Sequence, residues 1–271
     1  MRKEVLTVKI DNQLPEATLE VYLWEPSVEM WTGKRRPMVI VCPGGSYRFV
    51  SEREGDPIAM ELCCSGCHTA VLKYSVPASF PSALAQLSMA VAQVRHHADD
   101  WMVDKDKIIV QGSSAGGHLA ASLGVFWKEA FLTDILKEEA CMYRPDGLIL
   151  SYPVITTGKG MHAESFECLL GKDYEKMKEK VSLEKQVTKD VPPVFLWTTY
   201  ADDLVDAINS VVFVNALMEA GVPTEFHMYA SGVHGLALAN KVTESNEGYG
   251  IQKECENWIE MAKNWIWNLF M

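Results

Sequence analysis

A serine between glycines stands where a predicted strand turns into a predicted helix. Residues 112–116 read GSSAG and fit the pattern G-x-S-x-G, after an apolar run at 108–110 and before a helix that begins near Ala115. A turn this sharp strains its central residue, and the flanking glycines are needed because side chains there would collide with neighbouring backbone. The hydroxyl of Ser114 would stand exposed at a helix N-terminus, where the backbone potential favours developing negative charge. The pattern predicts Ser114 as a nucleophile, whereas Ser113 has the wrong position in it, and a glycine-rich loop that only packs is the alternative.

A serine nucleophile needs a base, and the chain has seven histidines. Only His234 lies in a loop bounded by glycines, Gly232 and Gly235, just after the last predicted strand, where an imidazole could lean over the sheet edge. His227 falls within that strand and is expected to pack there, and His118 is held on the helix after the nucleophile, where we expect a structural role. We therefore predict His234 as the base. The remaining histidines have no comparable placement: His68, His96, His97 and His162.

The third member of such a site is a carboxylate that holds the imidazole in the useful tautomer. The loop after the predicted strand 194–198 offers Asp202, Asp203 and Asp206. Asp202 comes first past the strand, where its carboxylate could accept the Nδ1 proton of His234, so we favour it. Asp203 is its main competitor, and carboxylates in loops are often simply exposed to solvent.

Acyl transfer at a serine also needs amide donors for the oxyanion of the tetrahedral intermediate. The amide of Ala115, directly after the nucleophile, is one candidate. The loop 43–47, PGGSY, follows the apolar run 38–42 and would bring further donors through Gly45 and Ser46, because glycine lets the backbone approach a ligand closely. The Pro-Gly-Gly string is weak evidence by itself and gains weight from the G-x-S-x-G segment that follows it.

The elements that would position these residues are short β-branched runs that alternate with longer helical stretches. This alternation is typical of parallel strands joined by crossover helices. The expected strands are 5–10, 18–24, 38–42, 69–74, 108–110, 147–152, 194–198 and 224–229, the first two as a hairpin. The expected helices are 57–64, 81–99, 119–127 and 207–220, with a final helix whose apolar stripe of Trp258, Met261, Ala262, Trp265 and Leu269 should dock on the sheet. A chain of 271 residues can form a single α/β domain of this kind.

Composition limits the classes of partner. The chain carries 25 basic and 36 acidic side chains and no long run of Lys or Arg that would track phosphates, so nucleic acid is not expected as a partner. The first residues hold no apolar segment of signal-peptide length, and no apolar stretch approaches a membrane span. Seven cysteines, an odd number, fit the thiols of a reducing compartment better than a disulfide framework. We expect a soluble cytoplasmic protein that needs no metal or organic cofactor.

Residues 64–68, CSGCH, fit the C-x-x-C-H pattern of c-type haem attachment. Haem attachment needs export, which the N-terminal sequence does not support. The cluster also lies where the helix 57–64 should end at Gly66 before the strand 69–74. We therefore expect buried small side chains around a glycine that ends the helix.

Two further segments leave alternatives open. Residues 156–191 are polar, rich in Lys and Glu, and inserted between two strands, so they form either a small cap beside a ligand or a plain surface insertion. At the C-terminus, Trp267, Phe270 and Met271 extend beyond the apolar stripe of the last helix. They either pack within the molecule or form the contact of a homodimer.

The motifs together resemble the esterase/lipase group of α/β hydrolases that carry an H-G-G-G-type oxyanion loop, especially small bacterial carbohydrate acetyl esterases. The resemblance covers about residues 37–238. The matching segments are 41–47 (VCPGGSY), 112–120 (GSSAGGHLA), 201–205 (ADDLV) and 233–236 (VHGL). In that group the acid stands three places before the valine of its loop, here Val205, which selects Asp202. Pro43 and Ser46 stand where the group usually has a histidine and its third glycine.

The resemblance implies the α/β-hydrolase fold, a doubly wound, mostly parallel sheet flanked by helices, in one domain over 1–271. It also implies ester hydrolysis through an acyl-enzyme, with Ser114, Asp202 and His234 as the triad. Short-chain and especially acetyl esters, of sugars or oligosaccharides, are expected as small-molecule substrates before long-chain lipids, because no extended apolar lid segment is apparent. The nearest rival is a peptidase or amidase, since the same triad cleaves amides, although peptidases of this fold often bring a further domain. The rival from another class is a binding protein that keeps the fold without chemistry, and such proteins usually lack a triad member.

Overall fold

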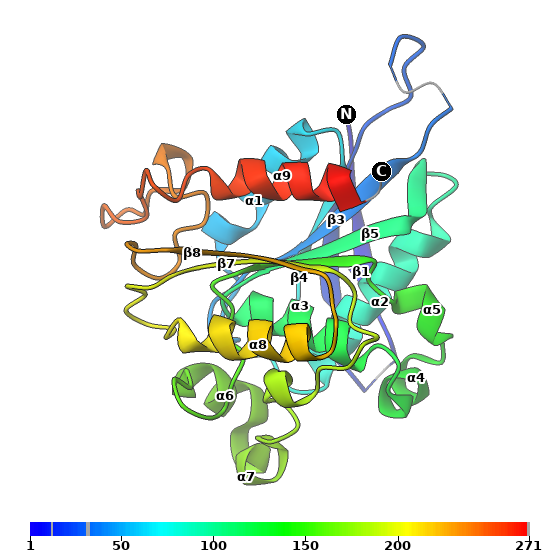
Figure 1. Cartoon of the computed structure of the whole chain (residues 1–271). Coiled ribbons are helices and arrows are strands. Elements are labelled where there is room, and N and C mark those ends of the chain that lie inside the picture. The colour runs from blue at the N-terminus through cyan, green and yellow to red at the C-terminus, as the bar shows by residue number, and fades with distance from the viewer. Residues whose placement is uncertain (12, 31–32, 270–271) are drawn as a thin grey trace.

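The computed structural model describes residues 1–11, 13–30 and 33–269, which form an eight-stranded sheet (Figure 1). The strands are β1 (Arg2–Val8), β2 (Ala17–Leu23), β3 (Arg36–Cys42), β4 (His68–Lys73), β5 (Val103–Ser113), β6 (Gly147–Ser151), β7 (Val194–Thr199) and β8 (Thr224–Tyr229). Their spatial order is β1-β2-β4-β3-β5-β6-β7-β8. β1 pairs with β2 and β2 with β4 in antiparallel fashion, and all pairs from β4 to β8 are parallel. The mostly parallel sheet expected from the sequence is confirmed.

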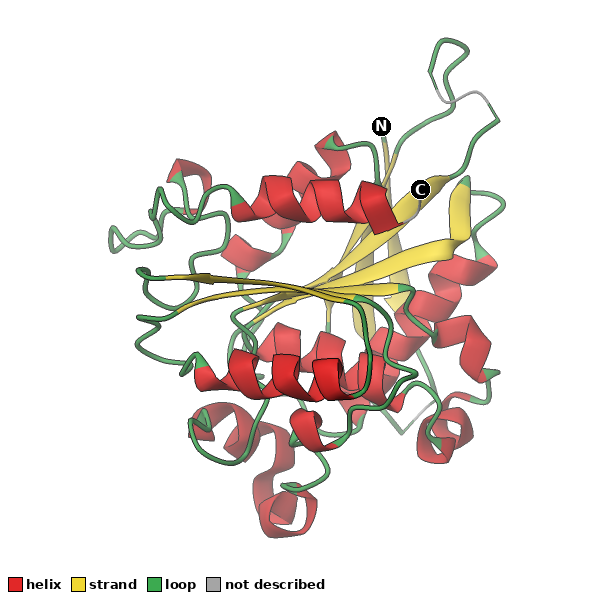
Figure 2. Cartoon of the chain, viewed as in Figure 1, coloured by secondary structure: helices red, strands yellow, loops and turns green. Residues whose placement is uncertain are grey.

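Helices cover both faces of this sheet (Figure 2). α1 (Asp56–Cys64) and α9 (Trp258–Leu269) lie on one face, and α2 (Ser82–His96), α3 (Ala115–Phe126) and α8 (Ile208–Glu219) lie on the other (Figure 1). The shorter helices are α4 (Ala130–Leu136), α5 (Ala140–Tyr143), α6 (Ala163–Leu170) and α7 (Tyr174–Met177), with 3-10 turns at Glu52–Glu54, Gly171–Asp173, Leu183–Lys185 and Lys241–Thr243. Because the strands from β3 to β8 run parallel, their carboxyl ends and the loops that follow them lie at one edge of the sheet.

Each face of the sheet has its own hydrophobic core. β3 is buried along its whole length, as expected of a central parallel strand. It sends Val39 and Val41 into the core under α1 and α9, and Ile40 into the core on the opposite face. On the α9 side the ring of Trp258 stacks on that of Trp197 in β7, with 5.0 Å between ring centroids. The strand ends are thus anchored between two packed layers, which gives the loops of the carboxyl edge a rigid base.

The last helix docks on the sheet as its apolar stripe predicts. The members of the stripe are buried or partly buried in the core of that face: Trp258, Met261, Ala262, Trp265 and Leu269. A Cβ at Gly66 would lie 3.4 Å from the ring of Trp267, so this ring lies beside the end of α1. Phe270 and Met271 lie outside the described residues, and the homodimer stays a prediction.

The boundaries found in the structure differ most from the sequence reading in β5. The sequence predicts that this strand begins at Ile108, but it begins at Val103, which pairs with Arg36 of β3. Residues 104–107 are charged and mostly at the surface, so no apolar run marks them as a strand. They extend the strand away from the edge that carries the candidate site.

The CSGCH segment joins α1 to β4. Gly66 has φ of +100°, as expected of a glycine that ends a helix. Cys67 and His68 are buried, and Nδ1 of His68 accepts the backbone amide of Trp24 at 3.0 Å. Cys64 is exposed, so the expectation of buried side chains throughout the segment is wrong at this position, which is the last residue of α1 and faces solvent.

Residues 156–191 leave the sheet between β6 and β7 and form α6, α7 and two of the 3-10 turns. They lie beyond the α3 and α8 layer, on the side away from the sheet (Figure 1). Two backbone hydrogen bonds join the segment to the rest of the described chain. The amide of Phe80 donates to the carbonyl of Leu169 at 3.0 Å, and the amide of Leu183 donates to the carbonyl of Ile155 at 3.1 Å.

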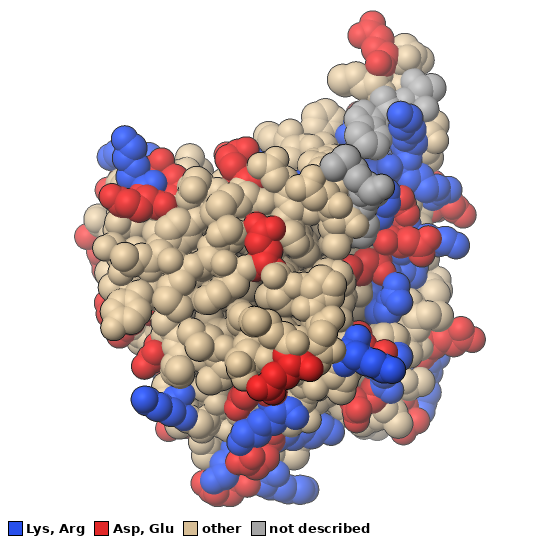
Figure 3. All heavy atoms as spheres, viewed as in Figure 1, with Lys and Arg blue, Asp and Glu red and all other residues tan. Residues whose placement is uncertain are grey.

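The described part of the chain contains no helix with the length and apolar character needed to cross a bilayer. On the face that Figure 3 shows, Lys and Arg side chains are interspersed with Asp and Glu side chains, and much of the middle of this face is uncharged. The described residues therefore form no extended basic surface on that face.

Candidate active site

β5 ends in a tight turn that carries Ser114. The residue has φ of +53° and ψ of −120°, a strained combination for a residue with a side chain, and α3 begins directly after it. A Cβ at Gly116 would stand 2.0 Å from the carbonyl oxygen of Cys42, and one at Gly112 would stand 2.1 Å from the carbonyl oxygen of Gly116. The chain can turn here only because both positions are glycine. The turn holds the side chain of Ser114 at the carboxyl edge of the sheet, at the N-terminus of α3.

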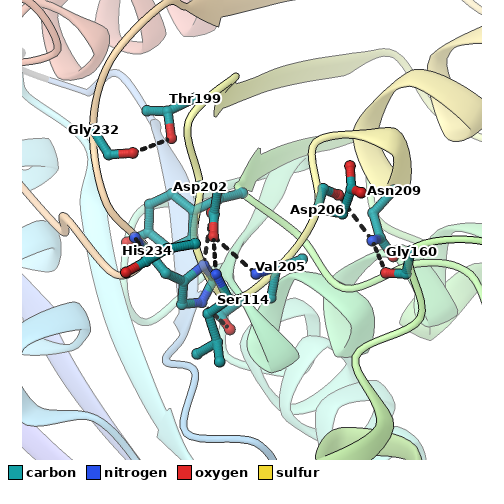
Figure 4. A network of polar contacts seen from close by, with 12 residues as sticks. Ser114, Gly160, Thr199, Asp202, Val205, Asp206, Asn209, Gly232 and His234 are labelled. Atoms are coloured by element: carbon teal, nitrogen blue, oxygen red, sulfur yellow. Dashed lines mark hydrogen bonds and ion pairs between the residues drawn. The ribbon is translucent and has the colours of Figure 1, made fainter.

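The structure brings Ser114, His234 and Asp202 together (Figure 4). Nε2 of His234 lies 2.7 Å from Oγ of Ser114, and Nδ1 of His234 lies 2.8 Å from Oδ2 of Asp202. The side chain of Asp202 is 1% exposed and that of His234 is 10% exposed. Because the carboxylate is shielded from water behind the imidazole, their interaction is weakly screened. A proton on Nδ1 directed at Asp202 leaves Nε2 free to accept the proton of the serine.

Two neighbouring carboxylates of the loop after β7 have separate partners. Oδ1 of Asp202 accepts the backbone amides of Leu204 at 3.0 Å and Val205 at 2.8 Å, which leaves Oδ2 for the imidazole. Asp203, the competitor considered from the sequence, accepts the backbone amide of His234 at 3.0 Å. Asp202 therefore contacts the ring of the histidine, and Asp203 contacts its main chain.

Asp206 points away from this cluster. Its carboxylate accepts the amide of Ile208 at the start of α8 at 2.9 Å. Its carbonyl accepts the side-chain amide of Asn209 at 2.9 Å, and the same side chain donates to the carbonyl of Gly160 at 2.8 Å (Figure 4). Asp206 thus begins a helix and, through Asn209, joins the acid loop to the segment 156–191.

Residues at the ends of β6 and β7 hold the loop that carries His234 in place. Thr199, at the end of β7, donates its hydroxyl to the carbonyl of Gly232 at 2.8 Å (Figure 4), and Gly232 has φ of +135°, which favours glycine. The ring of Tyr152, directly after β6, meets the imidazole edge-on with 5.1 Å between ring centroids. The ring of His234 is therefore positioned by packing as well as by hydrogen bonds.

The loop after β3 lies against Ser114. A Cβ at Gly44 would stand 2.9 Å from Cβ of Ser114, and the next two residues, Gly45 and Ser46, have φ of +122° and +52°. Within the described ranges, the backbone amides of Gly45, Ser46 and Ala115 donate to no protein group. Gly45 and Ser46 also line the pocket in front of the serine. These amides are available to a ligand at Ser114.

Glu54 is a buried residue of the site that the sequence analysis missed. The residue is 4% exposed. Its carboxylate accepts hydrogen bonds from the amide of Gly44 at 2.9 Å and from the hydroxyl of Tyr152 at 2.8 Å. The same hydroxyl accepts the amide of Ala237 in the histidine loop at 2.9 Å. Burial, and then the negative charge of Glu54, raise the pKa of Tyr152 well above its ordinary value. One carboxylate thereby connects the loop after β3 with the loop that carries the histidine.

His118 has the structural role that its place on α3 predicts. Its Nδ1 lies 2.8 Å from the hydroxyl of Tyr47, and its Nε2 lies 2.9 Å from the carbonyl oxygen of Val181. Burial lowers the pKa of His118 to about 4, so the ring is neutral near pH 7. In that state Nε2 donates to Val181 and Nδ1 accepts from Tyr47, which joins the loop after β3 to the segment 156–191.

Two other histidines lie outside the cluster. His227 contacts the ring of Phe195 with 5.3 Å between centroids, as expected of a packed strand residue, and its Nε2 lies 2.8 Å from the carboxylate of Glu225. His162, in the segment 156–191, is buried with Nδ1 2.9 Å from Oγ of Ser165. Burial and, secondarily, the imidazole of His234 lower its pKa.

A pocket of about 880 Å³ opens in front of Ser114. It is lined by Gly45, Ser46, Phe49, Val50, Ser51, Glu52, Arg53, Glu54, Ser114, Asp203, Leu204, Val233, His234, Gly235 and Tyr249. The described residues of 156–191 are not among these lining residues, so the segment does not cap this pocket. In the part of the chain that the structure describes, no three His, Cys, Asp or Glu side chains gather as a metal site.

Comparison with known proteins gives the same assignment of the fold. Residues 27–217 match the BD-FAE family. The carboxylesterase Cest-2923 of Lactobacillus plantarum superimposes with a TM-score of 0.87 at 29% identity, over 99% of this chain and 98% of that one. The acetyl ester-xyloside bifunctional hydrolase of Caldicellulosiruptor lactoaceticus superimposes with a TM-score of 0.83 at 28% identity, over 99% and 97% of the two chains.

Curated relatives are longer than this chain. Endo-1,4-beta-xylanase B of Butyrivibrio fibrisolvens is 39% identical over 213 residues, which are 76% of this chain and 33% of that protein. The chain spans between a third and a half of the length of the curated relatives that it matches. The sheet, its flanking helices and the matched residues show that this chain has the α/β-hydrolase fold and belongs to the BD-FAE family.

Proposed function

We propose that this chain is a serine carboxylesterase that removes short acyl groups, acetyl above all, from sugars or oligosaccharides. The observation that supports this most strongly is the line of contacts from Ser114 through His234 to Asp202, with separations of 2.7 and 2.8 Å. Membership of the BD-FAE family and the likeness to the esterases named above support hydrolysis of a carboxylic ester. The names of relatives that refer to xylan and xyloside support a carbohydrate as the alcohol.

In the proposed reaction, Nε2 of His234 takes the proton of Ser114 as its oxygen attacks the ester carbonyl. The carbonyl carbon becomes tetrahedral, and its oxygen carries the negative charge. The amides of Gly45, Ser46 and Ala115 donate to this oxyanion, an interaction that is usually worth about a hundredfold or more in rate for each donor.

The intermediate then collapses. The bond from the carbonyl carbon to the alcohol oxygen breaks, and the alcohol leaves with the proton from His234, so that the acyl group remains as an ester on Ser114. A water molecule, deprotonated by the same imidazole, attacks the carbonyl carbon of this ester. The bond from that carbon to Oγ of Ser114 then breaks, the imidazolium returns its proton to Oγ, and the carboxylic acid leaves. Asp202 stabilises the imidazolium that forms in each step and keeps the proton of Nδ1 in place.

Acyl length is tested directly by comparing the turnover of acetyl, butyryl and decanoyl nitrophenyl esters. We expect kcat/KM to be highest for acetyl and to fall with chain length, because the described residues include no extended apolar lid segment. A preference for decanoyl would remove the short-chain assignment. Equal or faster cleavage of the matching acetyl nitroanilide would favour an amidase over an esterase.

A further inference from the structure

Two exposed aromatic rings stand on the walls of the pocket in front of Ser114. Phe49 is 59% exposed and comes from the loop after β3, and Tyr249 is 43% exposed and comes from the segment between the histidine loop and α9. Exposed aromatic surface that lines a concave site next to a nucleophile is typical of ligand contact. Neither ring takes part in the hydrogen bonds of the triad.

One contact of Tyr249 holds its ring and another holds its main chain. The guanidinium of Arg53 lies over it, 4.8 Å from the ring centroid, and Nε of Arg53 donates to the carbonyl of Thr243 at 2.7 Å. The main chain of Tyr249 is held as well, since its carbonyl accepts the amide of Ser245 at 2.8 Å. Gly250, with φ of +99°, leaves room for Arg53, because a Cβ there would stand 2.2 Å from Nη2. A preorganised ring loses little conformational entropy on binding.

The charges of the same pocket are mostly negative. Its described lining residues include Glu52, Glu54 and Asp203, of which Glu54 already accepts from Gly44 and Tyr152 and Asp203 from the amide of His234. Among the described lining residues the guanidinium is that of Arg53, which lies over Tyr249 and donates through Nε to Thr243, while its Nη2 is buried without a hydrogen-bond partner. The three acidic residues outnumber this cation. An anionic alcohol would meet repulsion here, whereas neutral hydroxyls find acceptors.

We propose that Tyr249 and Phe49 form the subsite for the leaving alcohol, and that this alcohol is an uncharged sugar ring. A pyranose presents an apolar C–H face, which packs on an aromatic ring, and a rim of hydroxyls, which donate to carboxylates such as that of Glu52. This assignment rests on the proposed ester hydrolysis, in which the acyl group stays on Ser114 while the alcohol occupies the open side of the pocket.

The kinetic test compares two esters, an acetylated xylotriose and methyl acetate, whose alcohol has no ring. In Tyr249→Ala the ratio of kcat/KM for the saccharide to that for methyl acetate should fall roughly tenfold, mainly through KM, because truncation removes a tyrosine contact that is made with the bound substrate and the transition state alike. Phe49→Ala should lower the ratio in the same direction. Tyr249→Phe, which keeps the ring, should restore it, and Tyr200→Ala, which removes a tyrosine that is 75% exposed outside this pocket, should leave it unchanged. An unchanged ratio in both alanine variants of the subsite would overturn the proposal.

A binding test separates the subsite from the esterase activity. Saturation-transfer NMR on the Ser114→Ala protein should show contact with xylotriose, much weaker contact with trigalacturonate, and loss of the xylotriose signal when Tyr249→Ala is added. Failure of the wild type to hydrolyse any ester, with xylotriose still bound through Tyr249, would remove the proposed function and keep the subsite. Ester hydrolysis without this binding, or tighter binding of trigalacturonate, would remove the subsite and keep the function.

Discussion

Replacement of Asp202 by asparagine should reverse the proton position on His234. Oδ1 of Asp202 accepts two backbone amides, from Leu204 and Val205, and Oδ2 faces Nδ1 of the imidazole. An asparagine has one acceptor oxygen and one NH2 group, and the two backbone donors require the oxygen on their side. The NH2 group is therefore directed at Nδ1, which then has to accept a hydrogen bond, so that the proton of the ring moves to Nε2 and faces Ser114.

The size of the effect follows from this geometry. With a proton on Nε2 the imidazole cannot accept the proton of the serine, and the base is lost while the fold is kept. We expect kcat to fall about 10⁴-fold, the loss typical of an imidazole held in the wrong tautomer, which is about 5.5 kcal/mol of transition-state stabilisation. Asp203→Asn is the matched control, because an amide oxygen can still accept the backbone amide of His234, and we expect less than about a threefold loss.

The assay is the initial rate of acetyl nitrophenyl ester hydrolysis, with thermal unfolding of each variant to show that the fold is intact. Two outcomes would refute the reasoning. One is an Asp202→Asn variant that keeps a tenth or more of the wild-type rate, and the other is an Asp203→Asn variant that loses as much as Asp202→Asn does.

Further predictions concern the residues that support the site. Glu54→Gln leaves one of two buried donors, the amide of Gly44 or the hydroxyl of Tyr152, without its acceptor. The free energy of unfolding should therefore fall by about 1–3 kcal/mol, and kcat should fall with it. Urea denaturation and steady-state kinetics measure the two quantities, and unchanged values would contradict the linking role of Glu54. Gly44→Ala would place a Cβ 2.6 Å from the carboxylate of Glu54 and 2.8 Å from the carbonyl of Ser113. The loop after β3 would have to shift, so we expect more than about a tenfold loss of kcat/KM. Wild-type activity would contradict the need for a glycine at this position. Burial lowers the pKa of His118 to about 4 from its ordinary 6.5, so between these pH values the unfolded chain binds a proton that the folded chain does not. The stability that comes from the neutral ring is therefore fully present above pH 6.5. It is lost as the pH falls toward 4, by on the order of 3 kcal/mol. His118→Asn should flatten the acid branch of a plot of unfolding free energy against pH, and an equally steep branch would contradict the assignment.

The residues with a local signature could be found in the sequence. Ser114 has glycines on both sides because the backbone of the turn allows nothing larger, and His234 lies between glycines that bend its loop. Most strands could also be predicted from a local pattern, because buried parallel strands appear in the sequence as continuous apolar runs. β5 shows the limit, because its residues 104–107 are charged and half-buried or exposed.

Glu54 had no such signature. It stands in the run ERE, between Glu52 and Arg53, which reads as an exposed charged turn. Its burial arises from three distant segments, the loop after β3, the end of β6 and the histidine loop, that meet only in the folded chain. A sequence pattern carries no information about such a meeting, so a buried carboxylate looks the same as a surface one.

The segment 156–191 and Tyr249 show the same limit for pocket shape. The polarity and position of the segment did not decide between a cap and a surface insertion. In the structure it contacts His118 and Phe80, and it contributes none of its described residues to the pocket wall. Tyr249 lies in a polar stretch, and only the packing of Arg53 against its ring shows that it is held at the pocket.

The most direct test of the account is the identification of the nucleophile. The intact protein should react with a fluorophosphonate probe, and mass spectrometry of the digested product should place one adduct on Ser114. Labelling should be absent in Ser114→Ala and strongly slowed in His234→Ala, because the hydroxyl is reactive only while the imidazole 2.7 Å away can take its proton. Labelling of Ser114→Ala at the wild-type rate, or an adduct on another residue of the wild type, would contradict it.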